Sequence, residues 1–191
     1  CPSGRKVVVG DGGCGKTCLL IAFANDKFYE EYIFADFETY AADIEVDGKN
    51  IELFLWDTSG QEEYNHLRPI QYSAADVVLI CFSVARRVSL ENVSALWWLE
   101  VKHFCPNVPI LLIGTKSDLR EDRKELEKFA KVKERPVTSK DAETVAKRIE
   151  AVTYLECSAK TRSNVHAVFA EAAKAMISEK RKRKKYNCVL I

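Results

Sequence analysis

The chain has 191 residues, of which 47% are hydrophobic and 30% are charged. This length and balance predict one globular domain over 1–179 followed by a short tail over 180–191, and they exclude a collagen-like or largely disordered chain. Six of the 29 basic residues lie within 180–185, so 23 basic residues remain against 28 acidic ones elsewhere. An acidic body with a basic tail argues against broad nucleic-acid binding and indicates a local electrostatic role at the C-terminus.

The apolar segments and the cysteines indicate a cytosolic protein. No stretch approaches the ~20 apolar residues of a membrane-spanning helix, and the apolar run over 7–9 is too short for a secretory signal. The seven cysteines are an odd number in a chain long enough to fold without disulfides, which predicts reduced thiols. Cys14 and Cys18 have a spacing that zinc ligands could use, but no second pair follows, so zinc is the weaker interpretation.

The hydrophobic pattern predicts strands that alternate with helices. The two strands joined by Asp47-Gly48, the strongest short hairpin signal, are expected to be antiparallel. Continuous apolar runs such as 77–83 are typical of strands buried on both faces. In chain order the predicted elements are a strand over 5–10, a helix over 16–24, a loop over 28–37, strands over 39–46, 51–56 and 77–83, a helix over 89–104, a strand over 110–114, a charged helix over 120–135, a helix over 139–149, a strand over 154–156 and a helix over 165–180.

This alternation predicts an α/β fold with a six-stranded, mostly parallel sheet, one antiparallel edge strand and helices on both faces. The charged segment over 120–135 is either an exposed helix or a solvated insertion on a loop. Trp97 and Trp98 could form a partner surface, but on a helix we expect at least one of them in the core.

Residues 10–17, Gly-Asp-Gly-Gly-Cys-Gly-Lys-Thr, match the phosphate-binding pattern G-x-x-x-x-G-K-[ST] between a predicted strand and a predicted helix. Glycines at this spacing let backbone N–H groups turn inward around a polyphosphate, and the helix start adds its dipole. Lys16 supplies positive charge for the β and γ phosphates, and the Thr17 hydroxyl can bind Mg²⁺. A plain glycine turn before a helix is the weaker interpretation.

A second motif, Asp57-Thr58-Ser59-Gly60-Gln61, follows a predicted strand. In a parallel sheet ligands lie at the carboxyl ends of the strands, so Asp57 is expected near the phosphate-binding loop. Asp57 can hold the metal through water, the N–H of Gly60 can approach the γ-phosphate, and Gln61 can orient an attacking water.

Two further motifs indicate guanine. Residues 115–118 end a buried strand, and the Asp118 carboxylate can accept from N1–H and the 2-amino group of guanine together. Adenine offers neither donor, so the buried carboxylate would be left unsatisfied, at a cost of ~1–3 kcal/mol or more in binding free energy. Residues 158–160 follow the last strand and can offer a backbone N–H to guanine O6. A P-loop kinase or ATPase is therefore the less favoured enzyme class.

In this order the motifs resemble the small GTPases of the Ras superfamily, and specifically the Rho family, over essentially the whole chain. The charged helix over 120–135 looks like the insert that separates Rho proteins from other Ras relatives. The residues that carry the resemblance are 10–17, 56–58, 61–64, 67–69, 115–120 and 156–161.

The resemblance implies a switch that binds GTP or GDP with Mg²⁺ and hydrolyses GTP. Water oriented by Gln61 would attack in line while Lys16, Mg²⁺ and loop amides stabilise charge, and Gly12 would leave room for an arginine from a GTPase-activating protein. No arginine is evident in cis, so slow intrinsic turnover is expected. The implied catalytic residues are Gln61, Lys16 and Gly12, and the implied metal ligands are Thr17 and, through water, Asp57.

The resemblance also assigns the nucleotide and effector contacts. Phe28 would pack beside guanine and Lys116 over it, with switch I over 32–40 and switch II over 59–68. The implied nucleotide-binding residues are Gly12, Gly13, Cys14, Gly15, Lys16, Thr17, Cys18, Phe28, Asp57, Gly60, Thr115, Lys116, Asp118, Ser158, Ala159 and Lys160. The implied effector residues are Tyr32, Ala35, Asp36, Phe37, Glu38 and Tyr40.

Switch I departs from the family pattern at position 35, where the family has a threonine that binds Mg²⁺ in the GTP state. Ala35 keeps the backbone N–H but loses an oxygen ligand, a contact worth ~1.5–3 kcal/mol. One interpretation is that GTP orders switch I less fully and the protein acts as a nucleotide-holding, weakly switching scaffold. The other is an ordinary divergent member whose partners have adapted to this loop.

The C-terminal residues 188–191 form a C-a-a-X box, in which Cys188 would be prenylated, and Ile at X resembles the Leu that favours geranylgeranyl. One lipid binds membranes marginally, so the basic run over 180–185 would supply the second signal; a nuclear signal or a solvated helix end is the alternative.

The resemblance and the tail together imply partners and a location. The implied partners are an exchange factor, a GTPase-activating protein, a dissociation inhibitor, effector kinases or scaffolds acting on the actin cytoskeleton and cell shape or polarity, and an anionic membrane. We expect a monomer at the cytoplasmic face of the plasma membrane, with a cytosolic pool and no nucleic-acid partner.

Overall fold

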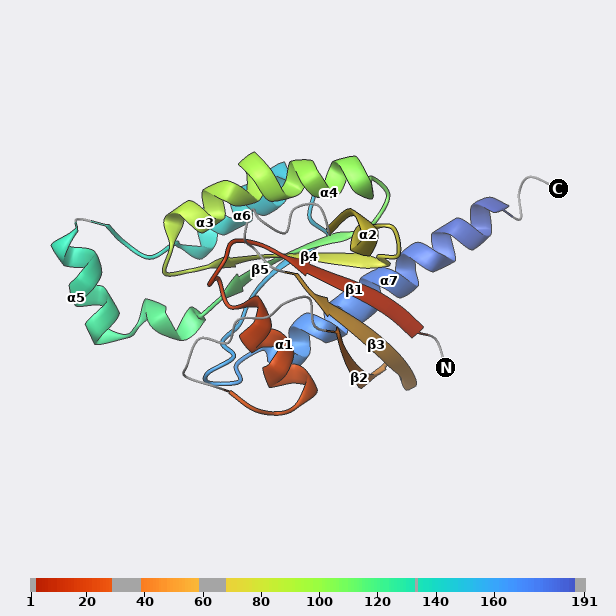
Figure 1. Ribbon diagram of the computed structural model, residues 1–191, viewed down its shortest axis with the longest axis horizontal. Helices are drawn as coiled ribbons and strands as arrows, with labels where there is room; N and C mark the ends of the chain where they lie inside the picture. Colours follow the sequence, from red (N-terminus) through yellow and green to blue (C-terminus); the bar gives the residue numbers. More distant parts are fainter. Residues whose placement is uncertain (1–2, 29–38, 59–67, 133, 188–191) are drawn as a thin grey trace.

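The computed structural model describes residues 3–28, 39–58, 68–132 and 134–187, and a six-stranded sheet lies at its centre (Figure 1). The order across the sheet is β2-β3-β1-β4-β5-β6, and only the β2–β3 pair is antiparallel. This confirms the predicted α/β fold with one antiparallel edge strand. The strands are β1 (Ser3–Val9), β2 (Thr39–Val46), β3 (Lys49–Asp57), β4 (Val77–Ser83), β5 (Ile110–Thr115) and β6 (Thr153–Glu156).

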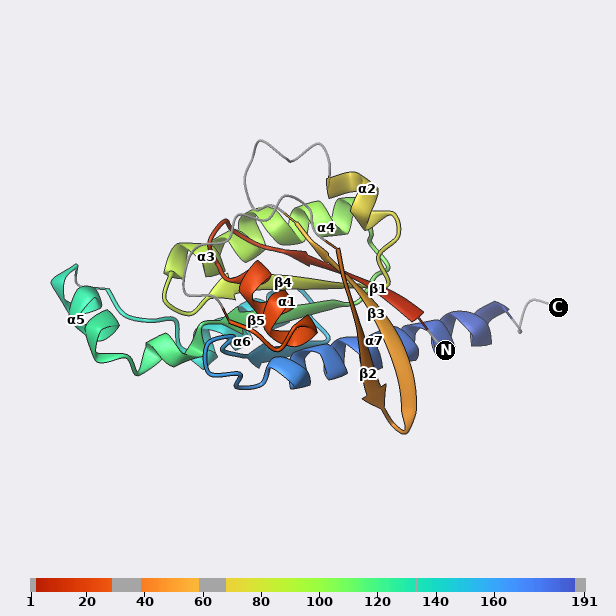
Figure 2. The same cartoon turned by 60° about the horizontal axis from the view of Figure 1, so that its bottom comes forward.

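The predicted hairpin turn joins the antiparallel strands. Asp47 and Gly48 have φ values of +52° and +71°, as a two-residue turn of type I′ requires. Val46 and Lys49 face each other as the last pair of the ladder. Figure 2 shows this hairpin reaching beyond the parallel strands.

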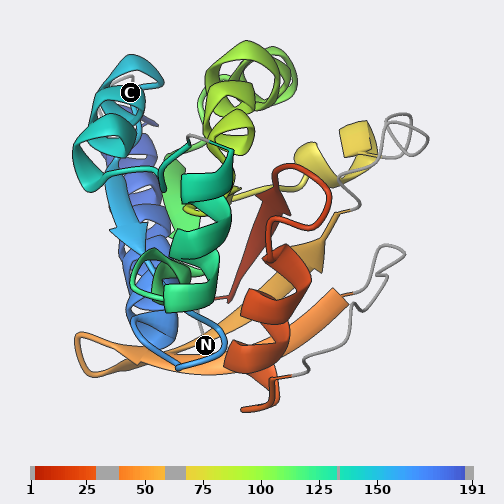
Figure 3. The same ribbon diagram turned by 90° about the vertical axis from the view of Figure 1, so that its left-hand side faces the viewer.

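Helices cover both faces of the sheet (Figures 1 and 3). One face carries α1 (Lys16–Ala24) and α7 (Val165–Asn187), and the other carries α6 (Ser139–Arg148) beside a continuous helical segment. That segment consists of α3 (Arg87–Asn92), the π-helix η2 (Val93–Trp97) and α4 (Trp98–Phe104). The remaining helical elements of the described ranges are α2 (Arg68–Tyr72), the 3₁₀ turn η3 (Ser117–Arg120) and α5 (Arg123–Lys131).

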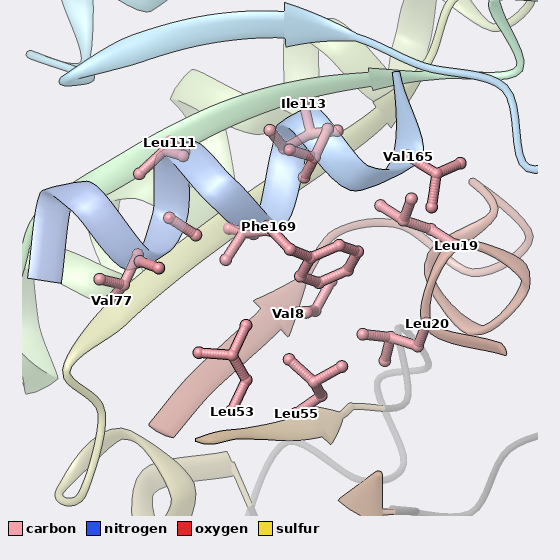
Figure 4. Close-up of a cluster of buried hydrophobic side chains, with 14 of the residues drawn as sticks. Val8, Leu19, Leu20, Leu53, Leu55, Val77, Leu111, Ile113, Val165 and Phe169 are labelled. Atoms are coloured by element: carbon pink, nitrogen blue, oxygen red, sulfur yellow. The ribbon is translucent and has the colours of Figure 1, made fainter. Parts of the chain in front are cut away.

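Two apolar cores separate the sheet from these helical layers, because successive side chains of a strand point to opposite faces. Val8 of β1 belongs to the core with Leu19 of α1 and Phe169 of α7, which Figure 4 shows. The neighbouring Val7 belongs to the opposite core, together with Trp97. Trp97 is only 2% exposed, so this tryptophan is a core residue, as expected for at least one of the pair.

Several helices differ from their predicted bounds. The helix expected over 89–104 begins at Arg87 and contains the π-helix, and the charged helix is confined to Arg123–Lys131. The last helix continues through the basic run to Asn187. The five-residue helix α2 was not predicted, because so short an element leaves no periodic pattern in the sequence. In the ranges that the structure describes, no helix is long and apolar enough to cross a membrane.

The parallel strands place the predicted motifs at one edge of the sheet. The carboxyl ends of β1, β3, β4, β5 and β6 meet there, since these strands run in the same direction. In an open α/β sheet this edge is where ligands bind. The loops that leave it carry the residues considered next.

Candidate nucleotide-binding site

The loop between β1 and α1 needs glycine for steric reasons. Gly10 has a φ of +142°, and a Cβ at this position would collide with the carbonyl oxygen of Cys81 on β4. Gly15 caps α1 with a φ of +98°, a left-handed conformation that few other residues adopt. At Gly12, by contrast, a Cβ would have no described atom within 4 Å. The loop therefore packs closely against β4 at its start and is open at Gly12.

Two backbone donors of this loop have no carbonyl acceptor in the part of the chain that the structure describes. Among the described residues, no backbone carbonyl accepts from the N–H groups of Gly13 or Thr17. N–H groups at the start of a helix carry partial positive charge and bind anions such as phosphate. The loop thus has the donor pattern of a phosphate site.

Two lysines add full positive charges to the same loop. Lys16 is 5% exposed, and its Nζ donates to the carbonyl oxygens of Gly10 at 2.8 Å and Asp11 at 3.0 Å. Lys116 donates from the other side to the carbonyl oxygen of Gly13 at 2.8 Å. A buried ammonium held by neutral carbonyls is only partly compensated, and a polyphosphate would complete it.

The predicted metal ligands lie in contact. The Thr17 hydroxyl donates to Oδ2 of Asp57 at 2.6 Å, and Asp57 is fully buried at the end of β3. Thr58 fixes this strand end by donating to the Val8 carbonyl at 2.6 Å. A hydroxyl and a carboxylate are the hard oxygen donors that Mg²⁺ prefers, so Thr17 and Asp57 fit this ion.

The predicted base-binding loops also meet. Ser158 is fully buried, and its hydroxyl donates to Oδ1 of Asp118 at 2.5 Å. The N–H of Ser117 donates to the Cys157 carbonyl at 3.1 Å, which joins the loop after β5 to the loop after β6. The N–H of Ser158 itself donates to the Ser163 carbonyl at 3.0 Å. A guanine oxygen would therefore have to use the N–H of the residues that follow, Ala159 or Lys160.

Thr115 links the phosphate loop to the sheet. Its hydroxyl donates to the carbonyl oxygens of Cys14 and Phe82, at 2.9 Å for the latter. Cys14 is fully buried in this junction, and burial raises the pKa of its thiol. Burial likewise raises the pKa of the half-buried Cys18 on α1. Raised pKa values disfavour the thiolate, so both cysteines are weak nucleophiles.

Asp11 forms an anchor that the sequence did not reveal. Its carboxylate accepts from the Trp97 indole N–H at 2.7 Å and from the Asn92 amide at 2.9 Å. These two donors are five residues apart, and the π-helix between them has the i to i+5 hydrogen bond from Trp98 to Val93. The wider turn lets both side chains reach the same carboxylate.

An ion pair holds the start of α2. Arg68, which is 1% exposed, donates to both carboxylate oxygens of Glu100 at 2.7 and 3.0 Å, and the Tyr72 hydroxyl donates to Oε1 at 2.7 Å. Burial alone would raise the pKa of Glu100, but the hydrogen bonds from Arg68 and Tyr72 hold it below its usual value. The Arg68 guanidinium also lies 5.0 Å from the ring centroid of Trp97.

The structure thus brings together most of the predicted phosphate, metal and base residues. Phe28 is half-buried after α1, and Tyr40 lies near the start of β2, also half-buried. Other predicted residues fall outside the described ranges: Tyr32, Ala35, Asp36, Phe37, Glu38, Gly60, Gln61 and Cys188.

A comparison with known protein families agrees with this geometry. A family model with the description "Ras family" matches residues 5–178. The match includes the phosphate loop, Asp57, and both base-binding loops, and it covers most of the 191 residues. The chain therefore belongs to the Ras family of small GTPases.

Proposed function

We propose that the protein is a GTP-hydrolysing switch of Rho type that is tethered to membranes through a prenylated tail. Membership of the Ras family supports GTP or GDP binding with Mg²⁺ and a cycle driven by exchange factors and GTPase-activating proteins. The observation that carries the proposal is the convergence of Lys16, Thr17, Asp57, Asp118 and Ser158 at one edge of the sheet.

The phosphate end of this site stabilises negative charge. Lys16 exchanges its carbonyl contacts for phosphate oxygens, and the N–H groups of Gly13 and Thr17 donate to the same anion. Thr17 and, through water, Asp57 would hold Mg²⁺, which would supply positive charge to offset the charge on the β and γ phosphates. Gln61 orients the attacking water, a role that rests on the motif alone.

The base end of the site selects guanine. The Ser158 hydroxyl fixes one oxygen of Asp118, which holds the carboxylate plane in a single orientation. A carboxylate fixed in this way accepts two N–H groups of guanine side by side, whereas adenine would leave it without donors. This favours GTP over ATP and argues against a kinase or ATPase.

The Rho assignment rests on residues outside the shared GTPase motifs. The charged helix α5 follows the base-binding loop, and only Phe129 of this helix is buried. Its exposed remainder is suited to contacts with other proteins. From the Rho resemblance we propose effectors, kinases or scaffolds, that act on the actin cytoskeleton, and a dissociation inhibitor that binds the lipid-bearing tail.

The tail supports attachment to an anionic membrane. Helix α7 carries the basic run beyond the body of the domain, and Figure 1 shows this end projecting away from the sheet. Each basic residue near an anionic leaflet contributes up to ~1 kcal/mol, which complements a prenyl group on Cys188. The proposed location is the cytoplasmic face of the plasma membrane, with a cytosolic pool.

A second candidate function rests on Ala35. Without the hydroxyl of a threonine at this position, the protein would hold nucleotide but switch weakly, and would act as a membrane-tethered scaffold. Single-turnover hydrolysis with and without a Rho-directed GTPase-activating domain separates the candidates. Strong acceleration supports the switch, and absence of acceleration with tight guanine-nucleotide binding supports the scaffold.

Nucleotide content tests the proposal directly. Protein purified in Mg²⁺ should release GDP or GTP on denaturation, and ATP should fail to displace a fluorescent guanine nucleotide at a hundredfold excess. Protein without bound guanine nucleotide, or with equal affinity for ATP, would contradict the function.

Two further experiments test the subfamily and the anchor. Comparison of Rho-directed with Ras-directed GTPase-activating domains tests the subfamily, and binding of a Cys188→Ser variant to anionic vesicles tests the membrane anchor.

A further inference from the structure

Arg86 contacts the phosphate loop from a distant part of the chain. Its Nη1 donates to the carbonyl oxygen of Gly12 at 2.9 Å, although the two residues are 74 positions apart. The same nitrogen would lie 3.9 Å from a Cβ placed on Gly13. No motif in the sequence indicated this contact, because Arg86 lies in the connection between β4 and α3.

The backbone of Arg86 is held firmly. Its N–H donates to the Ser83 carbonyl at 3.0 Å, and its carbonyl accepts from the N–H of Ser89 at 3.0 Å and from the Ser89 hydroxyl at 2.6 Å. Ser89 is fully buried and also accepts from the N–H of Ser83 at 3.0 Å. The guanidinium therefore extends from a fixed base at the end of β4.

Peptide geometry indicates what the contact does. The described peptide bonds are trans, so the carbonyl of Gly12 and the N–H of Gly13, which share one peptide, point in opposite directions. With the carbonyl turned toward Arg86, the Gly13 N–H points away from it and has no acceptor among the described residues. A cation on the carbonyl also polarises the peptide and makes its N–H a stronger donor.

The next peptide of the loop is held in a similar way. Lys116 donates to the Gly13 carbonyl at 2.8 Å, whereas the carbonyls of Gly10 and Asp11 are turned toward Lys16. Each of the two successive carbonyls, those of Gly12 and Gly13, therefore accepts from its own cationic side chain. Neither of them faces Lys16.

We propose that Arg86 is a positioning residue that fixes the Gly12–Gly13 peptide with its N–H directed at the phosphates of the bound nucleotide. This inference rests on the proposed function, because it assumes that the loop binds a guanine nucleotide. Arg86 acts through the peptide, and the Gly13 N–H touches the nucleotide. Loss of Arg86 should therefore weaken nucleotide retention and slow hydrolysis. The Gly13 N–H faces the phosphates, whose negative charge shifts toward the leaving group during hydrolysis.

The test compares Arg86→Ala and Arg86→Lys with Arg87→Ala, using the full chain. Arg87 is the matched control, because this neighbouring arginine pairs with Asp141 of α6 at 3.2 Å instead of with the phosphate loop. The contact from Arg86 to the Gly12 carbonyl is exposed to solvent, so its loss corresponds to the lower range for a hydrogen bond, about threefold to tenfold faster release of fluorescent GDP from Arg86→Ala. Arg86→Lys should restore part of the loss, because an ammonium can still donate to the carbonyl.

The amide resonance of Gly13 separates positioning from mere stability. In nucleotide-free and GDP-bound protein it should shift in Arg86→Ala and keep its position in Arg87→Ala. Release within twofold of wild type, with an unmoved Gly13 resonance, would overturn the proposal while leaving the GTPase function intact. If the wild-type protein failed to bind guanine nucleotide at all, the proposed function would fail, and with it a nucleotide-directed role for Arg86.

Discussion

The indole N–H of Trp97 donates to the carboxylate of Asp11 at 2.7 Å and so ties the middle of a long helical segment to the phosphate-binding loop. The Arg68 guanidinium lies over the same indole ring at 5.0 Å and pairs with Glu100. Trp97 thus stands between the start of α2 and Asp11. We infer that a change at either end alters the packing at the other.

Replacement of Trp97 by Phe should therefore weaken the loop. The variant keeps an aromatic ring but removes the N–H, leaving one oxygen of Asp11 without this partner, and we expect a loss of about 1.5–3 kcal/mol in unfolding free energy with faster GDP release. Trp98 provides a matched control. Its indole nitrogen is buried with no acceptor in the described ranges, so Trp98→Phe should be neutral or stabilising. Urea denaturation of both variants measures the difference, and equal losses would contradict the assigned role of Asp11.

Lys6 should make the stability of the protein depend on alkaline pH. This residue on β1 is fully buried, with its Nζ 3.2 Å from the sulfur of Met176. Burial lowers the pKa of Lys6 to about 8, an effect that Asp76 opposes and Lys180 reinforces. The charged form is therefore disfavoured in the folded state, and the cost of about 3 kcal/mol is fully present below pH 8.

That cost should diminish between pH 8 and the unfolded pKa near 10.5, as the folded protein loses the Lys6 proton. Lys6→Met removes the charge and nearly preserves the volume, so it should stabilise the protein by about 2–3 kcal/mol at pH 7. The advantage should be smaller at pH 9 and vanish toward pH 10.5. A stability difference that stays constant from pH 7 to pH 10 would show that Lys6 does not titrate in this range.

The parts of the molecule that the sequence predicted well are set by local pattern. Asp47-Gly48 adopts the left-handed turn that this pair favours, and helix α1 has the predicted bounds because a glycine cap and an apolar run define its ends. The phosphate loop is also local, since residues 10–17 supply the N–H groups and Lys16 together. In each case the physical cause lies within a few residues.

The contacts that escaped prediction are long-range. Asp11 meets Trp97 across 86 positions and Gly12 meets Arg86 across 74, and no spacing rule connects such pairs. The π-helix that brings Asn92 and Trp97 to the same carboxylate also has no distinct residue pattern in the sequence. Prediction from sequence therefore found the groups that touch the nucleotide more readily than the groups that position them.

Base selection should depend on the hydroxyl of Ser158. Ser158→Ala removes the 2.5 Å hydrogen bond that orients Asp118, so the carboxylate can rotate away from the geometry that guanine needs. We expect the preference for GTP over ATP to fall about threefold to tenfold, mainly through weaker GTP binding. Ser163→Ala is the control, because Ser163 contributes its backbone carbonyl to this turn. The preference is measured by displacing fluorescent GDP with unlabelled GTP and, separately, with unlabelled ATP. An unchanged ratio of the two affinities in Ser158→Ala would show that this hydroxyl does not contribute to base selection.

The contact between Thr17 and Asp57 should determine how the protein responds to loss of Mg²⁺. Chelation of Mg²⁺ is expected to accelerate GDP release from the wild-type protein. The GDP phosphates would lose the positive charge of the ion for which Thr17 and Asp57 are the expected ligands. Thr17→Ala removes one oxygen donor, so its release should already be fast in Mg²⁺ and should respond only weakly to chelation. Thr144→Ala, which removes an exposed hydroxyl bound to the Lys140 carbonyl, should keep the full wild-type response. If Thr17→Ala responded to chelation as strongly as Thr144→Ala, the metal would be held by other residues.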